Sequence, residues 1–298
     1  MSLVSLVKVQ GNQLKEAIQK SLEAIRYKAP AKIRNVIIKP NLCYYWDYST
    51  GQTTDPKFVA ALINLIRNKT SSNTDISIVE SDASAMKCKY AFKMLGYEKL
   101  AKNYDVNLVN LSSEDLYERV NVTVGKYTFR ISIPKTIQDA DLKINVPKIK
   151  YTIREIELTC ALKNIYGCNP YPKKFKYHPM LAETIVALNK VMRVDLCIVD
   201  GNIVSGIQPR RLGLVMASID PVAIDAAAAE IAELNPKKIR YLQLAEKEGI
   251  GNISYIPKGV PINYFKSRYP RKDFKKKLMG KAYAALLLTG LGEKLGLQ

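Results

Sequence analysis

Short apolar segments alternate with segments of helical spacing over residues 36 to 111. Three apolar runs each fit a buried strand: VIIKPN (36–41), DISIVES (75–81) and VNLVNL (106–111). Helical spacing fills the intervals between them, over 56–68 and 85–104, and Asp55 before Pro56 is a typical helix start. Parallel strands need such crossover connections. The pattern therefore predicts an α/β fold, a mostly parallel sheet with helices on both faces.

The rest of the chain continues this pattern with one interruption. Alternating segments around Gly125 predict an inserted antiparallel hairpin over about 117–134. The elements expected after it are a strand at 142–147, helices at about 154–166 and 179–192, strands at 195–201 and 212–218, and helices after Asp220-Pro221 and at 237–248. From residue 254, prolines and cations break the pattern. We therefore expect an α/β core domain over 1–253 and a basic extension over 254–298, in which 274–297 has the spacing of an amphipathic helix.

Positive charge dominates the composition. The 298 residues include 46 Lys and Arg against 27 Asp and Glu, a formal net charge of +19. Such an excess favours nucleic acid, anionic lipid headgroups or phosphorylated small molecules as partners. The residues predicted to bind RNA or another polyanion lie in the extension: Lys266, Arg268, Arg271, Lys272, Lys275, Lys276 and Lys277. Two alternatives stay open for this segment, a solvated tail and peripheral attachment to an anionic membrane surface.

The cysteines and the N-terminus indicate a cytoplasmic protein. The five cysteines are odd in number, scattered and without a CxxC pair, which fits reduced thiols. An iron–sulfur cluster is therefore not expected. The segment 1–13 lacks the basic start of a signal peptide and fits a first strand instead, and no apolar run reaches the length of a membrane span.

Polar side chains follow the predicted strands at the points where the strands end. Because the carboxyl ends of parallel strands meet at one edge of the sheet, ligands bind there. Crowding lysine and asparagine at that edge costs folding free energy, since like charges repel and burial removes their hydration, so it predicts a pocket for an anion. The alternative is that loops are polar in any protein. The residues expected to bind a small anionic ligand are Lys39, Asn41, Thr53, Thr54, Ser81, Asn145, Lys150 and Asn164.

Four residues are candidates for catalysis on that ligand. Lys148 and Lys163 are expected to stabilise negative charge, and His178 or Asp200 to move protons. His178 is the single histidine of the chain, and the alternative is a structural role. The leading hypothesis is an enzyme that acts on, or binds, a small carboxylate or phosphate, with the substrate and the reaction left open.

A divalent metal ion is the cofactor that the sequence suggests. Asp200 and Asp220, together with Asp225, offer the hard oxygen donors that Mg²⁺ prefers beside a phosphorylated ligand. The alternative for Asp220 is a helix cap ahead of Pro221. No GxxxxGK[ST], GxGxxG, HExxH or GxSxG motif is present, which removes the main support for the common nucleotide, zinc-protease and hydrolase sites.

A series of ordered motifs resembles the family catalogued as domain of unknown function 362, found in bacteria and archaea. The resemblance spans about residues 35 to 251 and rests on IKPN (38–41), TTDP (53–56), VES (79–81), AFKMLGY (91–97), DADLKINVPKIK (139–150), ALKNIYGC (161–168), His178, IVDG (198–201), LGLVMASIDPVAIDA (212–226) and GIG (249–251). The resemblance implies no particular reaction, because the activity of this family is largely unassigned. Many members are labelled iron–sulfur proteins for a cysteine module that this chain lacks. The family often has a histidine where this chain has Tyr151-Thr152, which leaves His178 alone.

Overall fold

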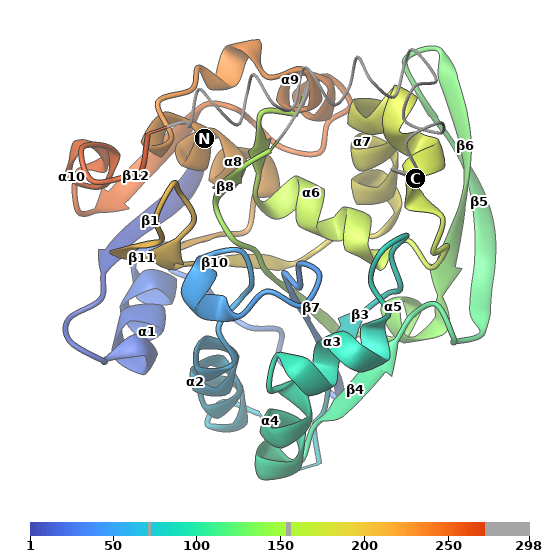
Figure 1. The fold of residues 1–298 in the computed structure, drawn as a ribbon, viewed down its shortest axis with the longest axis horizontal. Coiled ribbons are helices and arrows are strands. Elements are labelled where there is room, and N and C mark those ends of the chain that lie inside the picture. Colours follow the sequence, from blue (N-terminus) through green and yellow to red (C-terminus); the bar gives the residue numbers. More distant parts are fainter. Residues whose placement is uncertain (71–72, 153–155, 272–298) are drawn as a thin grey trace.

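An eight-stranded sheet forms the centre of the computed structural model, which describes residues 1–70, 73–152 and 156–271 (Figure 1). Its strand order is β12-β1-β11-β10-β7-β2-β3-β4. The strands are β1 (Ser2–Lys8), β2 (Asn35–Pro40), β3 (Asp75–Glu80), β4 (Asn107–Asn110), β7 (Leu142–Val146), β10 (Leu196–Val204), β11 (Arg210–Ser218) and β12 (Tyr255–Gly259). Within this sheet β11 is antiparallel to both neighbours and the other pairs are parallel. The predicted mostly parallel sheet is confirmed.

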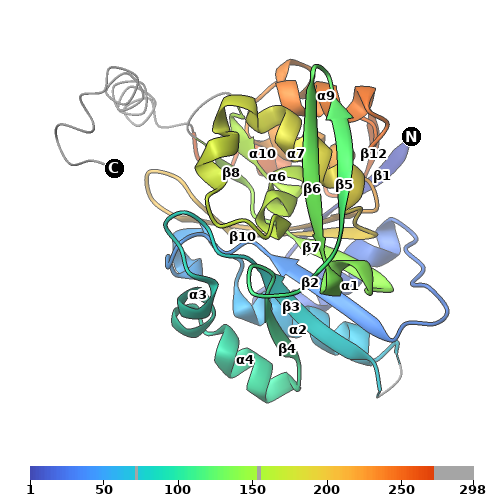
Figure 2. The ribbon, with the colours of Figure 1, turned by 90° about the vertical axis from the view of Figure 1, so that its right-hand side faces the viewer.

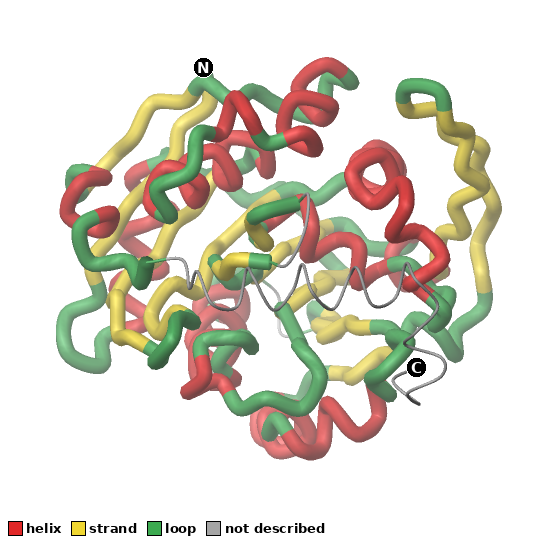
Figure 3. The backbone as a smooth tube through the Cα atoms, turned by 45° about the horizontal axis from the view of Figure 1, so that its top comes forward, coloured by secondary structure: helices red, strands yellow, loops and turns green. Residues whose placement is uncertain are grey.

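Helices cover both faces of the sheet, as predicted (Figure 2). The helices packed on one face are α1 (Leu14–Ala24), α2 (Pro56–Arg67), α3 (Cys88–Met94) and α4 (Tyr97–Tyr104). Those on the other face are α6 (Ala161–Ile165), α7 (Leu181–Val191), α8 (Pro221–Ile231), α9 (Arg240–Lys247) and α10 (Ile262–Lys266). The tube in Figure 3 shows the strands between these two layers. No helix in the described ranges is long and apolar enough to cross a lipid bilayer.

Two helices begin at aspartates that precede proline. Asp55 accepts a hydrogen bond from Lys57 N at 2.8 Å at the start of α2, with Pro56 in the first turn. Asp220 does the same for α8, where its Oδ1 accepts from Val222 N at 2.9 Å and Ala223 N at 3.0 Å. Each carboxylate satisfies amide groups that a helix leaves unpaired at its first turn. These helix starts are confirmed.

The antiparallel hairpin predicted over about 117–134 is present. β5 (Leu116–Val124) pairs with β6 (Tyr127–Pro134) as a separate two-stranded sheet, and Gly125 has a φ of +57° at the turn. A positive φ suits glycine, because it has no Cβ to clash. The hairpin stands beside α7 (Figure 2). A short helix, α5 (Lys135–Gln138), leads from it to β7.

Three predicted helices are shorter than expected. The segment 85–104 divides into α3 and α4 at Gly96, whose φ of +80° ends the helical path. Only α6 lies within the predicted helix 154–166, since β8 (Lys150–Tyr151) pairs with β9 (Leu158–Thr159), and 153–155 lie outside the described residues. The third of these predicted helices, 237–248, corresponds to α9, which starts at Arg240 after a 3₁₀ turn. Tertiary pairing overrides helical spacing in β9.

The predicted boundary at residue 253 falls inside the structural unit. β12 extends the main sheet by parallel pairing with β1, and Phe265 of α10 is buried in the core with Tyr269. Pro257 lies within β12, and a proline in the sequence argues against a strand. Proline is nevertheless tolerated in an edge strand such as this one. The predicted amphipathic helix over 274–297 lies outside the described residues.

Candidate functional site

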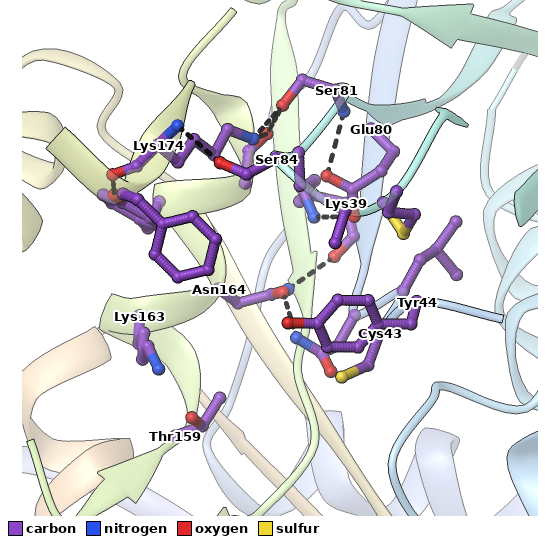
Figure 4. Close-up of a pocket in the computed structure, with 18 of the residues that line it drawn as sticks. Lys39, Cys43, Tyr44, Glu80, Ser81, Ser84, Thr159, Lys163, Asn164 and Lys174 are labelled. Carbon is purple, nitrogen blue, oxygen red and sulfur yellow. Dashed lines mark hydrogen bonds and ion pairs between the residues drawn. The ribbon is translucent and has the colours of Figure 1, made fainter. Parts of the chain in front are cut away.

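A cavity of about 270 Å³ opens at the carboxyl ends of β2 and β3 (Figure 4). Eleven of its lining residues carry polar or charged side chains: Lys39, Asn41, Glu80, Ser81, Ser84, Lys150, Thr159, Lys163, Asn164, Lys174 and His178. The apolar and thiol-bearing part of the lining includes Leu42, Cys43, Tyr44, Met86, Tyr166 and Phe175. We call this cavity the lysine pocket. Glu80 is the only carboxylate among its described lining residues.

Glu80 and Lys39 form a buried ion pair at the inner end of the lysine pocket. Lys39 Nζ lies 2.8 Å from Glu80 Oε2 and donates a second hydrogen bond to Pro40 O at 2.8 Å. The two side chains are 2% and 4% exposed. Gly167 packs against the pair so closely that a Cβ there would lie 2.8 Å from both Lys39 Nζ and Glu80 Oε1. The pair therefore contributes almost no net charge to the pocket.

A chain of amide groups joins the sheet to the pocket floor. Asn164 Nδ2 donates to Asn145 Oδ1 at 2.8 Å, and Asn41 Nδ2 donates to Asn164 Oδ1 at 2.9 Å. Asn41 Oδ1 in turn accepts from Lys150 Nζ at 2.8 Å. Gln52 O accepts a further bond from the same ammonium. Each link satisfies a buried polar group, so the chain holds Lys150 in one position.

Three lysines of the pocket have lowered pKa values. Burial lowers the pKa of Lys163 to about 8, and the nearby ammonium of Lys150 acts in the same direction. Burial also lowers the pKa of Lys174 to about 8, against the opposing effect of Glu80. Lys174 Nζ lies 2.5 Å from Ser81 Oγ. Burial likewise lowers the pKa of Lys150. These shifts mean that a bound anion would stabilise the charged forms of the pocket lysines.

Aromatic side chains form part of the lining of the lysine pocket. Phe175 stacks edge-on against the ring of His178, with centroids 4.8 Å apart, and both residues line the cavity. Tyr44 lies 5.5 Å from Trp46, centroid to centroid. Phe175, Tyr44 and Trp46 are exposed large side chains. The lining thus combines lysine ammonium groups with aromatic side chains.

Comparison with known proteins places the chain in a family. The family described as Domain of unknown function (DUF362) matches residues 36–230. The chain belongs to this family. The thylakoid-associated protein sll1697 of Synechocystis sp. is 25% identical over 234 residues, which cover 72% of this chain and 68% of that protein. The lactate racemase apoprotein from Thermoanaerobacterium thermosaccharolyticum aligns with a TM-score of 0.43 and 12% identity, over 78% of this chain and 58% of that chain. This chain thus spans less than two thirds of that structure.

The lysine pocket of this DUF362 protein brings together many of the predicted site residues. The predicted residues that line it are Lys39, Asn41, Ser81, Lys150, Lys163, Asn164 and His178. Asn145 lies beneath the pocket, where it supports Asn164 and donates to Ala161 O at 2.9 Å. Thr54 holds the loop above β2, because its hydroxyl bonds Asn41 N and Val146 O. Thr53 is buried nearby without a hydrogen-bond partner for its hydroxyl in the described chain.

Lys148 and Asp200 do not line the pocket and pair with each other instead. Their Nζ and Oδ2 atoms lie 3.1 Å apart, and each side chain is 1% exposed. Lys148 also donates to Ile203 O at 2.7 Å, and Asp200 Oδ2 accepts from Asp55 N at 2.9 Å. The two charges of this buried pair compensate each other outside the lysine pocket, and the catalytic roles predicted for the two residues stay predictions.

Asp200 and Asp220, the carboxylates of the predicted metal site, are engaged by other groups of the protein. Asp220 caps α8 and accepts from Ser2 Oγ at 2.7 Å, and Asp200 holds Lys148. Asp225 accepts from the backbone amides of Ala161 and Leu162. In the described ranges, no three His, Cys, Asp or Glu residues gather as metal ligands would. Helix capping and ion pairing occupy the oxygen atoms that a metal would need.

Sequence reasoning missed Lys174, Cys43 and Tyr44 as pocket residues, and it noted Glu80 at a strand end without selecting it as a ligand-binding residue. Lys174 belongs to a run of lysines, KKFKYH, in which nothing distinguishes one cation from the next. Glu80 ends β3 within the motif VES, and the position of this carboxylate at a strand end was a usable signal. Cys43 and Tyr44 lie in the loop after β2 and have no spacing to mark them.

The described basic residues of the predicted polyanion-binding segment lie on the surface. Lys266, Arg268 and Arg271 are exposed. The Arg268 guanidinium lies 3.8 Å from the centroid of the Tyr264 ring and donates to Tyr264 O at 2.8 Å. The remaining members of that predicted set, Lys272, Lys275, Lys276 and Lys277, lie outside the described residues.

Proposed function

We propose that this protein is an enzyme that binds and transforms a small anionic molecule, a carboxylate or a phosphate, in the lysine pocket. The observation that carries the proposal is the charge of the lining. Four lysines line the described cavity against one carboxylate, and that carboxylate, Glu80, is already paired with Lys39. Lys150, Lys163 and Lys174 therefore present uncompensated positive charge to whatever enters.

The dimensions of the pocket support a small molecule rather than a polymer. A volume of about 270 Å³ is at the lower end of ligand cavities in proteins. Asn41 and Asn164 are fixed by hydrogen bonds and can orient a ligand, while Leu42 and Met86 offer apolar contact. In this proposal His178, which lines the same cavity, transfers protons.

The proposal predicts that Lys163→Met weakens the binding of a small anion about tenfold or more without lowering the melting temperature, because Lys163 Nζ has no hydrogen bond to another described residue. Isothermal titration calorimetry against a panel of small carboxylates and phosphates measures the binding. Lys102→Met, on the exposed surface of α4, is the matched control. Unchanged affinity in the Lys163 variant would contradict the proposal.

We propose a second role for the basic residues Lys266, Arg268 and Arg271, which is binding of RNA or a similar polyanion. Their exposure and the net charge of +19 support it. The cytoplasm is the proposed location of the protein. Its five cysteines are free in the structure, which suits a reducing compartment.

A further inference from the structure

Lys163 differs from the other three lysines of the pocket. Lys39, Lys150 and Lys174 each donate to protein acceptors at 2.5–2.8 Å. Lys163 has no such acceptor among the residues that the structure describes, and its side chain is only half-buried where it lines the cavity. Figure 4 shows it beside Thr159, on the side of the pocket away from Ser81. Its amino group is therefore available to a ligand.

The surroundings of Lys163 favour a reactive amine. Lys150 is held close enough to repel its positive charge, and α6 carries both Lys163 and the asparagine that anchors the amide chain. At a pKa of about 8, about a tenth of the amino groups are neutral at pH 7, against roughly one in three thousand for an ordinary lysine. A lysine beside a second cation is a recognised source of an amine nucleophile.

The opposite wall of the pocket can hold an acid group. Lys39 Nζ donates to Pro40 O and Glu80, and Lys174 Nζ contacts Ser81 Oγ and Gly167 O. An ammonium has three N–H groups, so Lys174 keeps one for a ligand, whereas Lys39 is already paired with Glu80. A small molecule in the cavity can therefore meet a nucleophilic amine on one side and cationic donors on the other.

We propose that Lys163 Nζ forms an imine with a small 2-oxo acid whose carboxylate is held by the other lysines of the same pocket. The inference rests on the proposed function and names its substrate class. The small cavity favours this class, because a 2-oxo acid carries its carbonyl carbon next to the carboxylate. The imine links Lys163 covalently to the substrate. Once protonated, it is a cation that can accept electrons from a neighbouring carbon.

The step balances without an external oxidant or reductant. The lone pair of neutral Lys163 Nζ attacks the carbonyl carbon, and the carbonyl electron pair moves to oxygen, which takes up a proton. The carbinolamine then loses that oxygen as water while the nitrogen lone pair forms the C=N bond. The C=O double bond has been replaced by a C=N double bond, and both amine protons leave in the water molecule, so the product is a neutral imine. One further proton, taken up from solvent, converts it to the iminium cation.

Borohydride trapping tests the imine. The full-length protein is incubated with pyruvate or glyoxylate, reduced with sodium borohydride, and measured by intact mass and peptide mapping. We expect one adduct per chain, on Lys163. Lys163→Arg keeps a positive charge but cannot form the adduct, so the adduct should disappear from this variant, with circular dichroism melting as the folding check. Lys102→Arg, on exposed α4, should keep it.

The outcomes separate the imine from the proposed function. Lactate, which has the carboxylate but no carbonyl carbon to attack, should bind in calorimetry and give no adduct. Binding of lactate together with no adduct from either 2-oxo acid would overturn the imine and leave the anion pocket standing. An adduct that persists in Lys163→Arg, or is spread evenly over surface lysines, would also overturn it. Failure of all three acids to bind would overturn the imine, and failure of the whole panel of carboxylates and phosphates to bind would overturn the proposed function as well.

Discussion

At the scale of single residues, the lysine pocket is defined by which charges are paired. Lys39 is 2% exposed and its partner Glu80 is 3% exposed, so neither can rely on water for charge stabilisation. Gly167 packs directly against the pair, so any side chain at this position would overlap it. Lys163, in contrast, has no protein acceptor in the described ranges. The pocket therefore separates a structural lysine from one left free for chemistry.

The Lys39–Glu80 pair gives a stability prediction. Glu80→Gln should lower the free energy of unfolding by about 3 to 5 kcal/mol, because it leaves a buried ammonium without its counter-charge. Urea unfolding followed by circular dichroism measures the loss. The double variant Lys39→Met, Glu80→Gln should recover part of the lost free energy of unfolding, since these two positions then carry no buried charge. A double variant no more stable than Glu80→Gln would contradict this explanation.

The lowered pKa values of Lys163 and Lys174, each about 8, predict how binding depends on pH. An anion binds the charged ammonium, so affinity for a non-reactive anion should be constant well below pH 8 and fall as the pH rises through 8. Calorimetry between pH 6 and pH 9 measures the slope. Lys163→Met should make the slope shallower, because Lys174 still titrates at about pH 8. An affinity independent of pH in the wild type would be the contrary result.

At the scale of elements, α6 depends on its neighbours. This helix has five residues, too few to be stable alone, yet it presents Lys163 and Asn164 to the pocket. Asp225 of α8 accepts from Ala161 N at 2.5 Å and Leu162 N at 3.2 Å at its start. Asn189 of α7 donates to Leu162 O at 2.9 Å. Packing from two longer helices thus fixes the position of the reactive lysine.

Asp225 makes this support sensitive to pH. Burial raises its pKa to about 7, although hydrogen bonds from Ala161, Leu162 and Tyr241 act in the opposite direction. The folded chain therefore holds a proton between about pH 4 and pH 7 that the unfolded chain has lost, so this group's contribution to stability falls as the pH rises through that window. The slope is about 1.4 kcal/mol per pH unit where only the folded state is protonated.

Asp225→Asn removes this titration and keeps one acceptor oxygen for the start of α6. The variant should show a smaller decline in unfolding free energy between pH 4 and pH 7 than the wild type. Urea unfolding at several pH values in that window gives both slopes. Parallel slopes in the two proteins would show that Asp225 does not titrate there.

At the scale of the whole molecule, sheet topology separates two cationic regions. The lysine pocket lies at the ends of β2 and β3, while β12 and α10 lie at the opposite edge of the sheet, next to β1 (Figure 1). Lys266, Arg268 and Arg271 are exposed on and after α10. Binding of a small anion and binding of a polyanion are therefore expected to be independent.

The triple variant Lys266→Ala, Arg268→Ala, Arg271→Ala tests the polyanion role. It should weaken RNA binding at low salt and reduce the dependence of affinity on salt, because fewer counterions are released from the RNA. Fluorescence anisotropy over a salt series measures both quantities. The control Lys93→Ala, Lys99→Ala, Lys102→Ala removes the same charge from the exposed surface of α3 and α4. Equal loss of RNA affinity in the two variants would mean that net charge alone attracts RNA. Co-sedimentation with anionic liposomes tests the alternative, which is binding to a membrane surface.

The local sequence pattern predicted the positions of residues whose place in the fold depends on their neighbours along the chain. Lys39, Asn41 and Ser81 follow or end buried strands, and the shared direction of β2 and β3 brings these residues to one edge. The caps at Asp55 and Asp220 were equally local. Lys174 could not be found this way, because it reaches the pocket through a 3₁₀ segment within a run of similar lysines.

The sequence by itself determined the alternation of strands and helices, the parallel sheet and the edge at which polar groups gather. These follow from apolar periodicity and from amides and carboxylates within a few residues of one another. The tertiary structure alone decided which charges are cancelled. Lys39 meets Glu80 41 positions away, and Lys148 meets Asp200 across two paired strands, 52 positions away. Such pairs depend on sheet register, and the chemistry left to Lys163 depends on the pairs.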